Sequence, residues 1–271
     1  MAAGARCVIY ETLRFVKAPA RVTLYETQRF VIGKALPMPV SLVIGGTSGV
    51  GLATARQLLA RGDDVHLAGR DAARLDAALA EVPGATGHRL DAQDAEAVRA
   101  LVASLAPLDR LVLTLSGRQG LGALAELDLG DLRRAFDGKF WAHLTAVQAA
   151  LPHLAEAASV TLVSAITARV ALPGTAGVAS LNAAVEGLVK PLAAELAPIR
   201  VNAVSPGYVD TPWWTMAGEE RDAAFAGFAA GLPTRRIATA DDVAEAVVFA
   251  ATNPNLTGTV IESDGGVGLV A

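Results

Sequence analysis

Three glycines, Gly45, Gly49 and Gly51, separate a short β-branched run at 40–44 from a helical pattern at 52–60, and a second apolar run follows at 65–68. This order predicts a β-α-β unit, because the apolar residues have the strand and helix periods on either side of the turn. Glycines at such a turn let the backbone approach a pyrophosphate, and the amino end of the helix supplies N–H donors and partial positive charge. We therefore predict a nucleotide site here in preference to a merely tight turn.

The chain after Met38 continues this alternation of strands and helices. Segments of helical length, rich in Ala and Leu, separate further strand candidates at 89–90, 111–115, 160–163, 199–204 and 259–262. Such alternation implies a parallel sheet that is covered by helices on both faces and joined by right-handed crossovers. We expect an α/β fold with a doubly wound parallel β-sheet in a single domain over residues 38–271.

Residues 1–37 differ from the rest and are predicted to be an N-terminal extension. Basic residues outnumber acidic ones there, although the whole chain has a formal net charge of -4. Within this segment, residues 10–12 and 14–16 recur at 25–27 and 29–31, a repeat that fits two short strands or short amphipathic helices. We consider an arm that clasps a partner subunit, a mobile extension, and translation begun upstream of a natural start at Met38.

Composition excludes several classes of function. A sequence pI of about 5.6 argues against nucleic acid as a partner. Every apolar run is broken before the roughly 18 residues that a membrane span needs, so we expect no membrane span. Cys7 is the only cysteine, so no intrachain disulfide is expected, and the expected location is the cytoplasm. The histidines His66, His88 and His153 show no metal-ligand spacing, so we predict no metal.

The glycine spacing, Gly-x-x-x-Gly-x-Gly, resembles that of the short-chain dehydrogenase/reductase family, and the resemblance extends from Met38 to Ala271. It includes Leu90-Asp91-Ala92, which resembles an adenine-contacting segment, and the closing signature Asp264-Gly265-Gly266. It implies a Rossmann-type fold and an oxidoreductase with a nicotinamide cofactor. The cofactor-binding residues that it implies are Gly45, Thr47, Ser48, Gly49, Val50, Gly51, Arg70, Asp91, Ser116, Gly117, Asn182, Pro206, Gly207, Val209 and Thr211.

Arg70 is the residue from which we predict whether NAD(H) or NADP(H) binds. It follows Gly51 by 19 residues, where an acidic residue would hold a ribose hydroxyl of NAD(H). A guanidinium at this position suits the 2′-phosphate of NADP(H), so we predict NADP(H); the alternative is an arginine that points into solvent.

The chain departs from the family where its chemistry takes place. The family's catalytic Asn, Ser, Tyr and Lys align with Lys139, Ala165, Val178 and Asn182. In the family the Tyr moves the proton of the carbonyl group, the Ser holds the substrate oxygen, and the Lys lowers the pKa of the Tyr. Valine does none of this, so an ordinary ketone reduction needs another proton donor.

We consider three stand-ins for the changed catalytic residues. Burial would lower the pKa of Lys139 and make it a usable acid; otherwise it is a lysine at a helix surface or subunit interface. Asn182 could keep the ribose contact or simply pack its helix. Thr167 could supply a hydroxyl near the substrate oxygen, whereas Ser164, next to the aligned position in a strand, should face the other way. His143 lies one helical turn after Lys139 and is the weaker candidate.

The residues that follow Thr211 are expected to determine which substrate binds. Paired tryptophans beside a cofactor suggest a small apolar or aromatic ligand, although a subunit contact is the alternative. Family resemblance implies a homotetramer or homodimer built through the helices at 140–151 and 178–196. The aromatic and sulfur-containing residues of the predicted lid are Trp213, Trp214, Met216, Phe225 and Phe228.

Three functions remain open at this point. The first is an atypical NADP(H)-dependent oxidoreductase that acts on a carbonyl or a conjugated small molecule. The second is a non-redox enzyme, such as a cyclase, isomerase or dehydratase, on the same scaffold. The third is a catalytically silent cofactor-binding protein.

Overall fold

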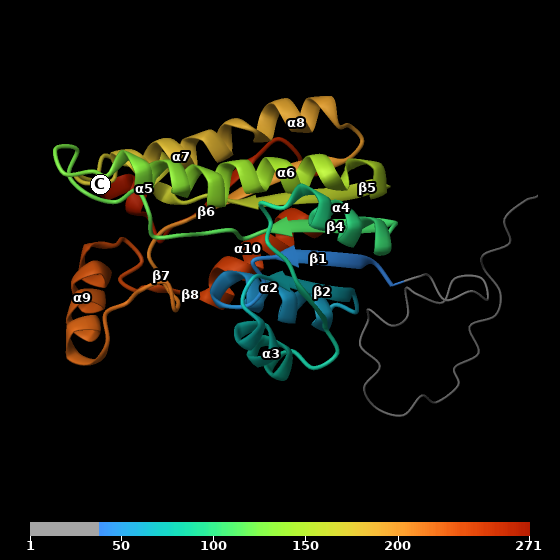
Figure 1. Ribbon diagram of the computed structural model, residues 1–271. Coiled ribbons are helices and arrows are strands. Elements are labelled where there is room, and N and C mark those ends of the chain that lie inside the picture. The colour runs from blue at the N-terminus through green and yellow to red at the C-terminus, as the bar shows by residue number, and fades with distance from the viewer. Residues whose placement is uncertain (1–37) are drawn as a thin grey trace, which may run out of the picture. The chain divides into compact units, whose positions relative to one another are not determined.

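The computed structural model describes residues 38–271, and its centre is a parallel sheet of seven strands in the order β3-β2-β1-β4-β5-β6-β9 (Figure 1). The order reverses between β1 and β4, which is the place where doubly wound sheets bind ligands. A separate pair is formed by β7 (Val209–Asp210) and β8 (Ala238–Thr239). The strands of the main sheet are β1 (Val40–Ile44), β2 (Asp64–Gly69), β3 (Thr86–Arg89), β4 (Leu108–Leu113), β5 (Leu154–Val163), β6 (Arg200–Pro206) and β9 (Val260–Ser263).

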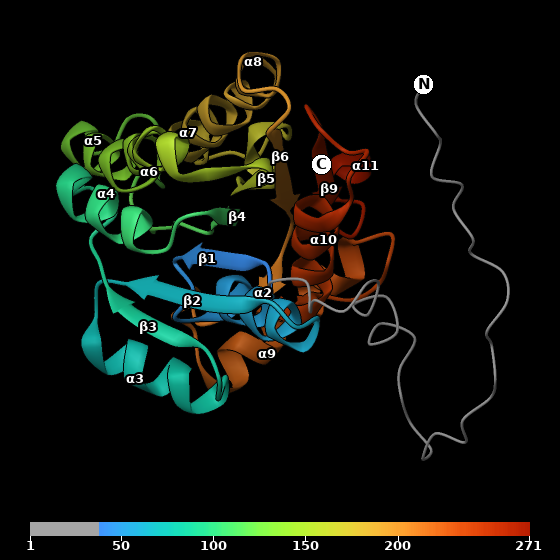
Figure 2. The same cartoon turned by 90° about the vertical axis from the view of Figure 1, so that its right-hand side faces the viewer.

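Helices cover both faces of the sheet (Figure 2). One face packs against α4 (Ala95–Ser104), α6 (Ala142–Ala150) and α7 (Ala176–Gly187). The other packs against α2 (Gly49–Ala60), α3 (Ala72–Glu81) and α10 (Ala240–Thr252). The remaining helical segments are α5 (Leu129–Phe136), η1 (Asp137–Trp141), η2 (Leu151–His153), η3 (Ile166–Ala168), α8 (Val189–Glu195), α9 (Gly218–Gly231) and α11 (Val267–Val270).

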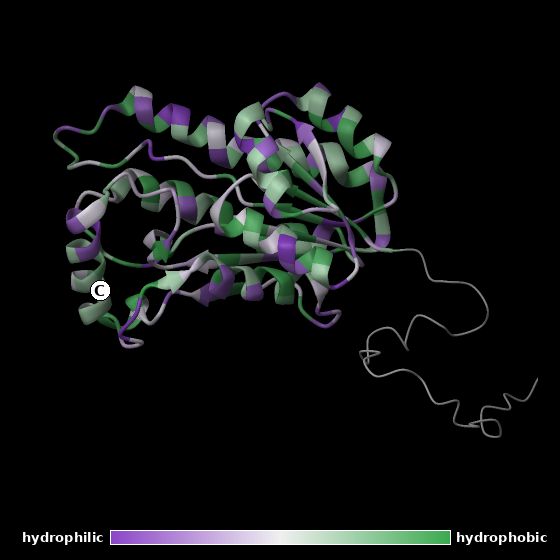
Figure 3. Ribbon diagram, turned by 90° about the horizontal axis from the view of Figure 1, so that it is seen from below, coloured by the Kyte–Doolittle hydropathy of each residue, from purple (hydrophilic) through white to green (hydrophobic). Residues whose placement is uncertain are grey.

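Strand β1 illustrates why this sheet is buried on both sides. Leu42 and Ile44 pack into the cluster with α4 and α6, whereas Val43 packs into the cluster with α2 and α10. Successive side chains of a strand point to opposite faces, so a strand covered on both faces is apolar throughout. The buried Ser41 is satisfied by its hydroxyl donating to Asp63 at 2.6 Å. The helices, which are covered on one side, carry both hydrophobic and hydrophilic stretches (Figure 3).

The predicted α/β fold with a doubly wound, Rossmann-type parallel sheet is confirmed. The predicted strand at 111–115 begins earlier and ends earlier, as β4 (Leu108–Leu113). Its charged residue Arg110 is compatible with the sheet because it pairs with the buried Asp63 at 2.7 Å. Helix α2 begins at Gly49 and not at residue 52, so Gly49 and Gly51 lie in the first turn of the helix.

The predictions for residues 1–37 lie outside the described residues, and the boundary at Met38 therefore remains a prediction. Within residues 38–271, no helix is long and apolar enough to cross a membrane.

The turn between β1 and α2 is unusually close. Gly45 and Gly49 have φ angles of 90° and 51°, a region that favours glycine. A Cβ atom on Gly51 would lie 2.4 Å from the carbonyl oxygen of Gly45 and 2.5 Å from Thr114 Oγ1. The helix therefore approaches the end of β1 as closely as it does only because residue 51 has no side chain.

We expect Gly51→Ala to lower the free energy of unfolding by about 1–3 kcal/mol, because the added methyl group overpacks this turn. Urea denaturation measures the change. The control is Gly227→Ala in α9, where nothing lies within 4 Å of the new methyl group and alanine favours the helix by about 0.5–1 kcal/mol. Wild-type stability of Gly51→Ala would mean that α2 can withdraw from β1 without cost.

Candidate active site

Three loops meet at the carboxyl ends of the strands, the side on which α9 lies (Figure 1). The loop after β1 touches the loop after β4, since a Cβ atom on Gly45 would lie 2.7 Å from Thr114 Oγ1. It also touches the segment after β7, since a Cβ atom on Gly49 would lie 3.2 Å from Thr211 Cγ2. Gly207, after β6, is held as closely against the backbone of Asp264. Most of the residues predicted to bind a cofactor therefore lie around one edge of the sheet.

The amino end of α2 suits an anion. Its N-cap residue, Ser48, is extended and makes no side-chain cap hydrogen bond. The first N–H groups of a helix have no partner within the helix, and they carry partial positive charge. Thr47 and Val50 flank this end and are half-buried. A pyrophosphate group would fit these donors.

A second arginine accompanies Arg70. Both Arg70, directly after β2, and Arg89, the last residue of β3, are exposed. The register pairs Gly69 with Arg89, and Arg89 Nε donates to the carbonyl oxygen of Arg70 at 3.3 Å. The guanidinium of Arg89 thus lies beside the backbone of Arg70 at this edge. Arg89 was not identified from the sequence as a candidate cofactor residue. Arg89 lies two residues before Asp91, which was identified. The exposed carboxylate of Asp91 accepts the N–H of Gln93 at 3.1 Å.

Lys139 is buried in the π-helical segment η1, with 7% of its surface exposed. Its ammonium donates to Asn182 Oδ1 at 2.7 Å and to the carbonyl oxygen of Ser164 at 3.2 Å. Among the described residues no carboxylate forms an ion pair with it. Burial lowers the pKa of Lys139 to about 8, and the charge of Glu186 opposes this shift.

Asn182, on α7, links Lys139 to Thr167. Its amide nitrogen donates to Thr167 Oγ1 at 2.9 Å and to the carbonyl oxygen of Val178 at 2.9 Å. With its oxygen accepting from Lys139, the amide has one orientation that satisfies every contact. The structure thus brings the predicted catalytic residues Lys139, Asn182 and Thr167 into one hydrogen-bonded chain, which ends at a half-buried hydroxyl. We refer to this chain as the lysine relay.

Ser164 and His143 lie beside the lysine relay and have other partners. The Ser164 hydroxyl donates to Glu186 Oε1 at 2.8 Å, as expected for a side chain that faces away from the aligned position. His143 is fully buried, with Nδ1 2.7 Å from the carbonyl oxygen of Lys139 and Nε2 3.3 Å from that of Leu113. Burial lowers the pKa of His143 to about 4, with the charge of Lys139 adding to the shift. His143 is therefore uncharged at neutral pH and acts as a buried packing residue of its helix.

Most of the predicted lid residues form an aromatic cluster with Tyr208. The rings of Tyr208 and Phe228 are stacked with centroids 4.6 Å apart, and Trp214 lies 5.6 Å from Phe228 and 5.8 Å from Phe225. Trp214 Nε1 donates to the carbonyl oxygen of Val209 at 2.9 Å, so this tryptophan anchors α9. Trp213 is the one that reaches the loop after β4, where its Nε1 donates to the carbonyl oxygen of Gly117 at 3.0 Å.

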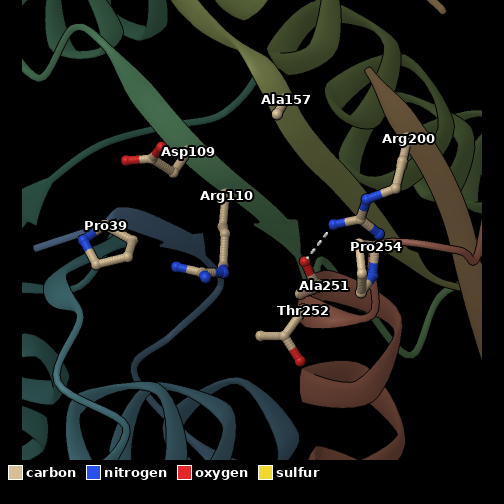
Figure 4. Close-up of a pocket in the computed structure, with 8 residues that line it drawn as sticks. All are labelled: Pro39, Asp109, Arg110, Ala157, Arg200, Ala251, Thr252 and Pro254. Carbon is tan, nitrogen blue, oxygen red and sulfur yellow. Dashed lines mark hydrogen bonds between the residues drawn. The ribbon is translucent and has the colours of Figure 1, made fainter. Parts of the chain in front are cut away.

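A hollow of about 170 Å³ is lined by residues of β4, β5 and the end of α10, together with Pro39 before β1 and Arg200 at the start of β6 (Figure 4). The two arginines that line it, Arg110 and Arg200, bind neighbouring elements of the fold. Arg110 pairs with Asp63, and Arg200 donates to the carbonyl oxygens of Ala250 and Ala251 at the end of α10. Within residues 38–271, no group of three or more His, Cys, Asp and Glu side chains is placed to hold a metal ion.

Comparison with known proteins covers most of the chain. Residues 45–268 match the family described as Enoyl-(Acyl carrier protein) reductase. An uncharacterized oxidoreductase of Methylorubrum extorquens is 35% identical over 84% of this chain and 97% of its own length. A small-chain dehydrogenase solved in complex with NADPH is 34% identical, with a TM-score of 0.76 over 86% of this chain and 100% of that one.

A second solved structure, the MalC Reductase/Diels-Alderase from Malbranchea aurantiaca, is 29% identical, with a TM-score of 0.79 over 86% of this chain and 97% of that one. Likeness of this extent in both sequence and strand arrangement shows that the chain belongs to the short-chain dehydrogenase/reductase family of oxidoreductases.

Proposed function

We propose that this protein is an atypical NADP(H)-dependent oxidoreductase that reduces, or forms by oxidation, a carbonyl or conjugated group on a small molecule. The lysine relay is the observation that carries the proposal. A buried ammonium without a carboxylate partner costs free energy, and such groups are concentrated at functional sites. This one lies at the carboxyl edge of the sheet, where ligands bind in doubly wound folds.

The residues around the glycine turn fit NADP(H). The close approach at Gly51 and the uncapped end of α2 suit a pyrophosphate, and Arg70 with Arg89 suits the 2′-phosphate. The NADPH complex of a relative that is 34% identical supports the same cofactor. When bound, this cofactor supplies or accepts the hydride. Asp91, Ser116, Pro206 and the other predicted cofactor residues remain proposals for contacts with the adenosine and nicotinamide.

We also propose that the usual catalytic set of the family is replaced here. Lys139, Ala165, Val178 and Asn182 occupy the aligned positions. The half-buried Val178 has no side-chain proton to give, and its carbonyl oxygen already accepts from Asn182. The proton must therefore come from elsewhere in the site.

In our proposal Lys139 provides that proton. Two N–H groups of its ammonium are engaged by Asn182 and Ser164, which leaves a further N–H to donate. In the reducing direction, the ammonium would give a proton to the carbonyl oxygen as the carbonyl carbon takes up the hydride that the cofactor supplies, and the neutral amine would then recover a proton from water. Thr167 accepts from Asn182, so its own O–H is free to hold the substrate oxygen. Asn182 is then a positioning residue for the other two.

A conjugated substrate would need less help from an acid. Hydride adds to a carbon remote from the carbonyl group, and the charge is spread over the conjugated system before it is protonated. The aromatic cluster lies beside the segment from Pro206 to Thr211, which we propose contacts the nicotinamide. Such a cluster suits an apolar or aromatic substrate of this kind.

A second candidate function is non-redox chemistry on the same scaffold. It is favoured by one observation, the likeness to MalC, whose name joins a reductase activity to a Diels-Alderase activity. In that case the pocket would orient a substrate for ring formation, and product would accumulate without net oxidation or reduction of the nicotinamide. Parallel measurement of product and of absorbance at the NADPH band separates the two functions.

We expect the double variant Arg70→Gln, Arg89→Gln to bind NADPH about 10- to 100-fold more weakly, because charge-assisted hydrogen bonds to the 2′-phosphate are lost. NADH affinity should stay nearly constant. Fluorescence titration of the tryptophans with each cofactor measures both. The control is Arg61→Gln, an exposed arginine at the far end of α2. An equal loss for NADPH and NADH would contradict the phosphate assignment.

We expect Lys139→Met to lower the rate of carbonyl reduction by about 100- to 10,000-fold, the range that a general acid contributes. In the wild type the reduction rate should fall as pH rises through about 8, because the ammonium loses its proton there. The control is Lys190→Met, on the exposed side of α8. Turnover by Lys139→Met at the wild-type rate would exclude Lys139 as the acid.

Stability gives an independent test of the buried ammonium. The pKa of Lys139 is lower in the folded chain than its ordinary value of 10.5, so the unfolded chain binds more protons between pH 8 and 10.5. The stability of the wild type relative to Lys139→Met should therefore rise with pH across this window and be lowest below about 8. Thermal unfolding of both proteins measures this difference, and a difference that is constant with pH would contradict the burial of a charged Lys139.

Restoring the family's catalytic set should create generic ketone reduction. All four positions must change together (Lys139→Asn, Ala165→Ser, Val178→Tyr and Asn182→Lys), because a lysine at 182 beside Lys139 would bring two ammonium groups together. We expect NADPH oxidation with simple aryl ketones to rise at least about tenfold over the wild type. No gain in a variant that still binds NADPH would show that the pocket differs from the family beyond these four residues.

A further inference from the structure

Arg118 lies on the loop after β4, directly after Ser116 and Gly117. The start of this loop is fixed beside the glycine turn, where Thr114 packs against Gly45 and its N–H donates to the carbonyl oxygen of Ile44 at 2.9 Å. Arg118 therefore leaves the sheet beside the glycine turn, where we propose that the cofactor binds.

The same loop runs along the first turns of α7. A Cβ atom on Gly120 would lie 3.7 Å from Val178 Cγ1, and one on Gly177 would lie 2.5 Å from the carbonyl oxygen of Gly120. Further on, the N–H of Gly122 donates to the carbonyl oxygen of Gly174 at 2.9 Å. Arg118 is thus two residues from Gly120, which contacts Val178. Val178 lies one helical turn before Asn182 of the lysine relay.

On its other side the loop is joined to the segment that leads into α9. Arg118 donates from its guanidinium to the carbonyl oxygen of Pro212 at 3.0 Å, and Trp213 Nε1 donates back to Gly117. The guanidinium carbon lies 6.0 Å from the centre of the Trp213 ring. Arg118 therefore lies between the α7 side of the site and its aromatic side.

The guanidinium of Arg118 has no carboxylate partner in the described part of the chain. Other arginines on this side are paired: Arg169 with Glu186 and Glu262, and Arg221 with Asp210. Its hydrogen bond to the carbonyl oxygen of Pro212 uses one of its N–H donors, and the others are available for a ligand. An arginine fork matches a carboxylate with two parallel hydrogen bonds, and a neighbouring aromatic face adds to the attraction.

We infer that Arg118 binds a carboxylate on the substrate, so that the protein acts on small apolar acids whose charged end lies away from the reacting carbon. The Trp213 ring, whose centre lies 6.0 Å from the guanidinium carbon, offers an apolar surface for the body of such a molecule. The inference deepens the proposed function and rests on it for the reaction, but carboxylate binding is measurable without turnover. The cofactor's own pyrophosphate is the competing anion, and the experiment separates the two.

The test uses two ligands of matched shape, 4-acetylbenzoate and 4-acetylbenzamide, which differ in charge. Each is titrated calorimetrically into the full chain, with and without NADPH, at about 150 mM salt so that long-range charge effects are screened. We expect the wild type to bind the acid at least about tenfold more tightly than the amide, as for hydrogen bonds to a charged group. Arg118→Gln should remove this preference by weakening the acid alone, and Arg118→Lys should keep part of it.

Several outcomes would overturn the inference. These are equal affinity of the wild type for acid and amide, no binding of the acid, or a preference that survives in Arg118→Gln. A loss of NADPH affinity in Arg118→Gln, with the ratio of acid to amide unchanged, would assign Arg118 to the cofactor and overturn it as well. Selective binding of the acid without oxidation of NADPH would support the carboxylate site while contradicting the proposed reduction of carbonyl groups.

Discussion

The contact between Gly51 and the carbonyl oxygen of Gly45 sets how closely α2 approaches the end of β1, and the rest of the site is arranged around it. Thr114 packs against Gly45, and Thr211 packs against Gly49, so the loops from both halves of the sheet are positioned by the same turn. A side chain at any of these glycines would move the loops apart. The fold therefore provides a narrow, backbone-lined edge with an uncapped helix end, which is the arrangement that binds phosphate groups.

The second unusual feature is the burial of a lysine that forms no ion pair with a carboxylate among residues 38–271. The Lys139 ammonium is held by one side-chain amide and one backbone carbonyl, both uncharged acceptors. Desolvation favours the neutral amine in such surroundings, which is why the pKa of this group falls towards the physiological range. Our proposal that Lys139 donates a proton rests on this environment. The hydroxyl of the neighbouring Ser164 donates to Glu186, which Arg169 holds, and the carbonyl oxygen of Ser164 accepts from Lys139, so the two networks meet at Ser164.

Membership of the family accounts for the fold of this chain, whereas its chemistry depends on the residues of the site. Members of one fold share the sheet and the glycine turn because these are requirements of packing and cofactor approach. The residues of a site are free to change, and the site proposed here includes a lysine, an asparagine and a threonine in one relay. It also includes Arg118 on the loop after β4, which has no carboxylate partner among the described residues. In our proposal the enzyme recognises an apolar acid and protonates the reacting oxygen of this substrate with an amine.

The sequence alone determined the fold and indicated the place of the candidate site. Strands covered on both faces are mostly apolar, and a turn that carries a phosphate is rich in glycine, so both features are visible as local patterns. Only the tertiary structure decided which distant side chains meet. Lys139 reaches Asn182 across 43 positions, and Arg89 reaches Arg70 because β2 and β3 pair in one register. Such contacts depend on strand register, side-chain rotamers and burial, which a local pattern does not contain, because they are set by the packing of the whole domain.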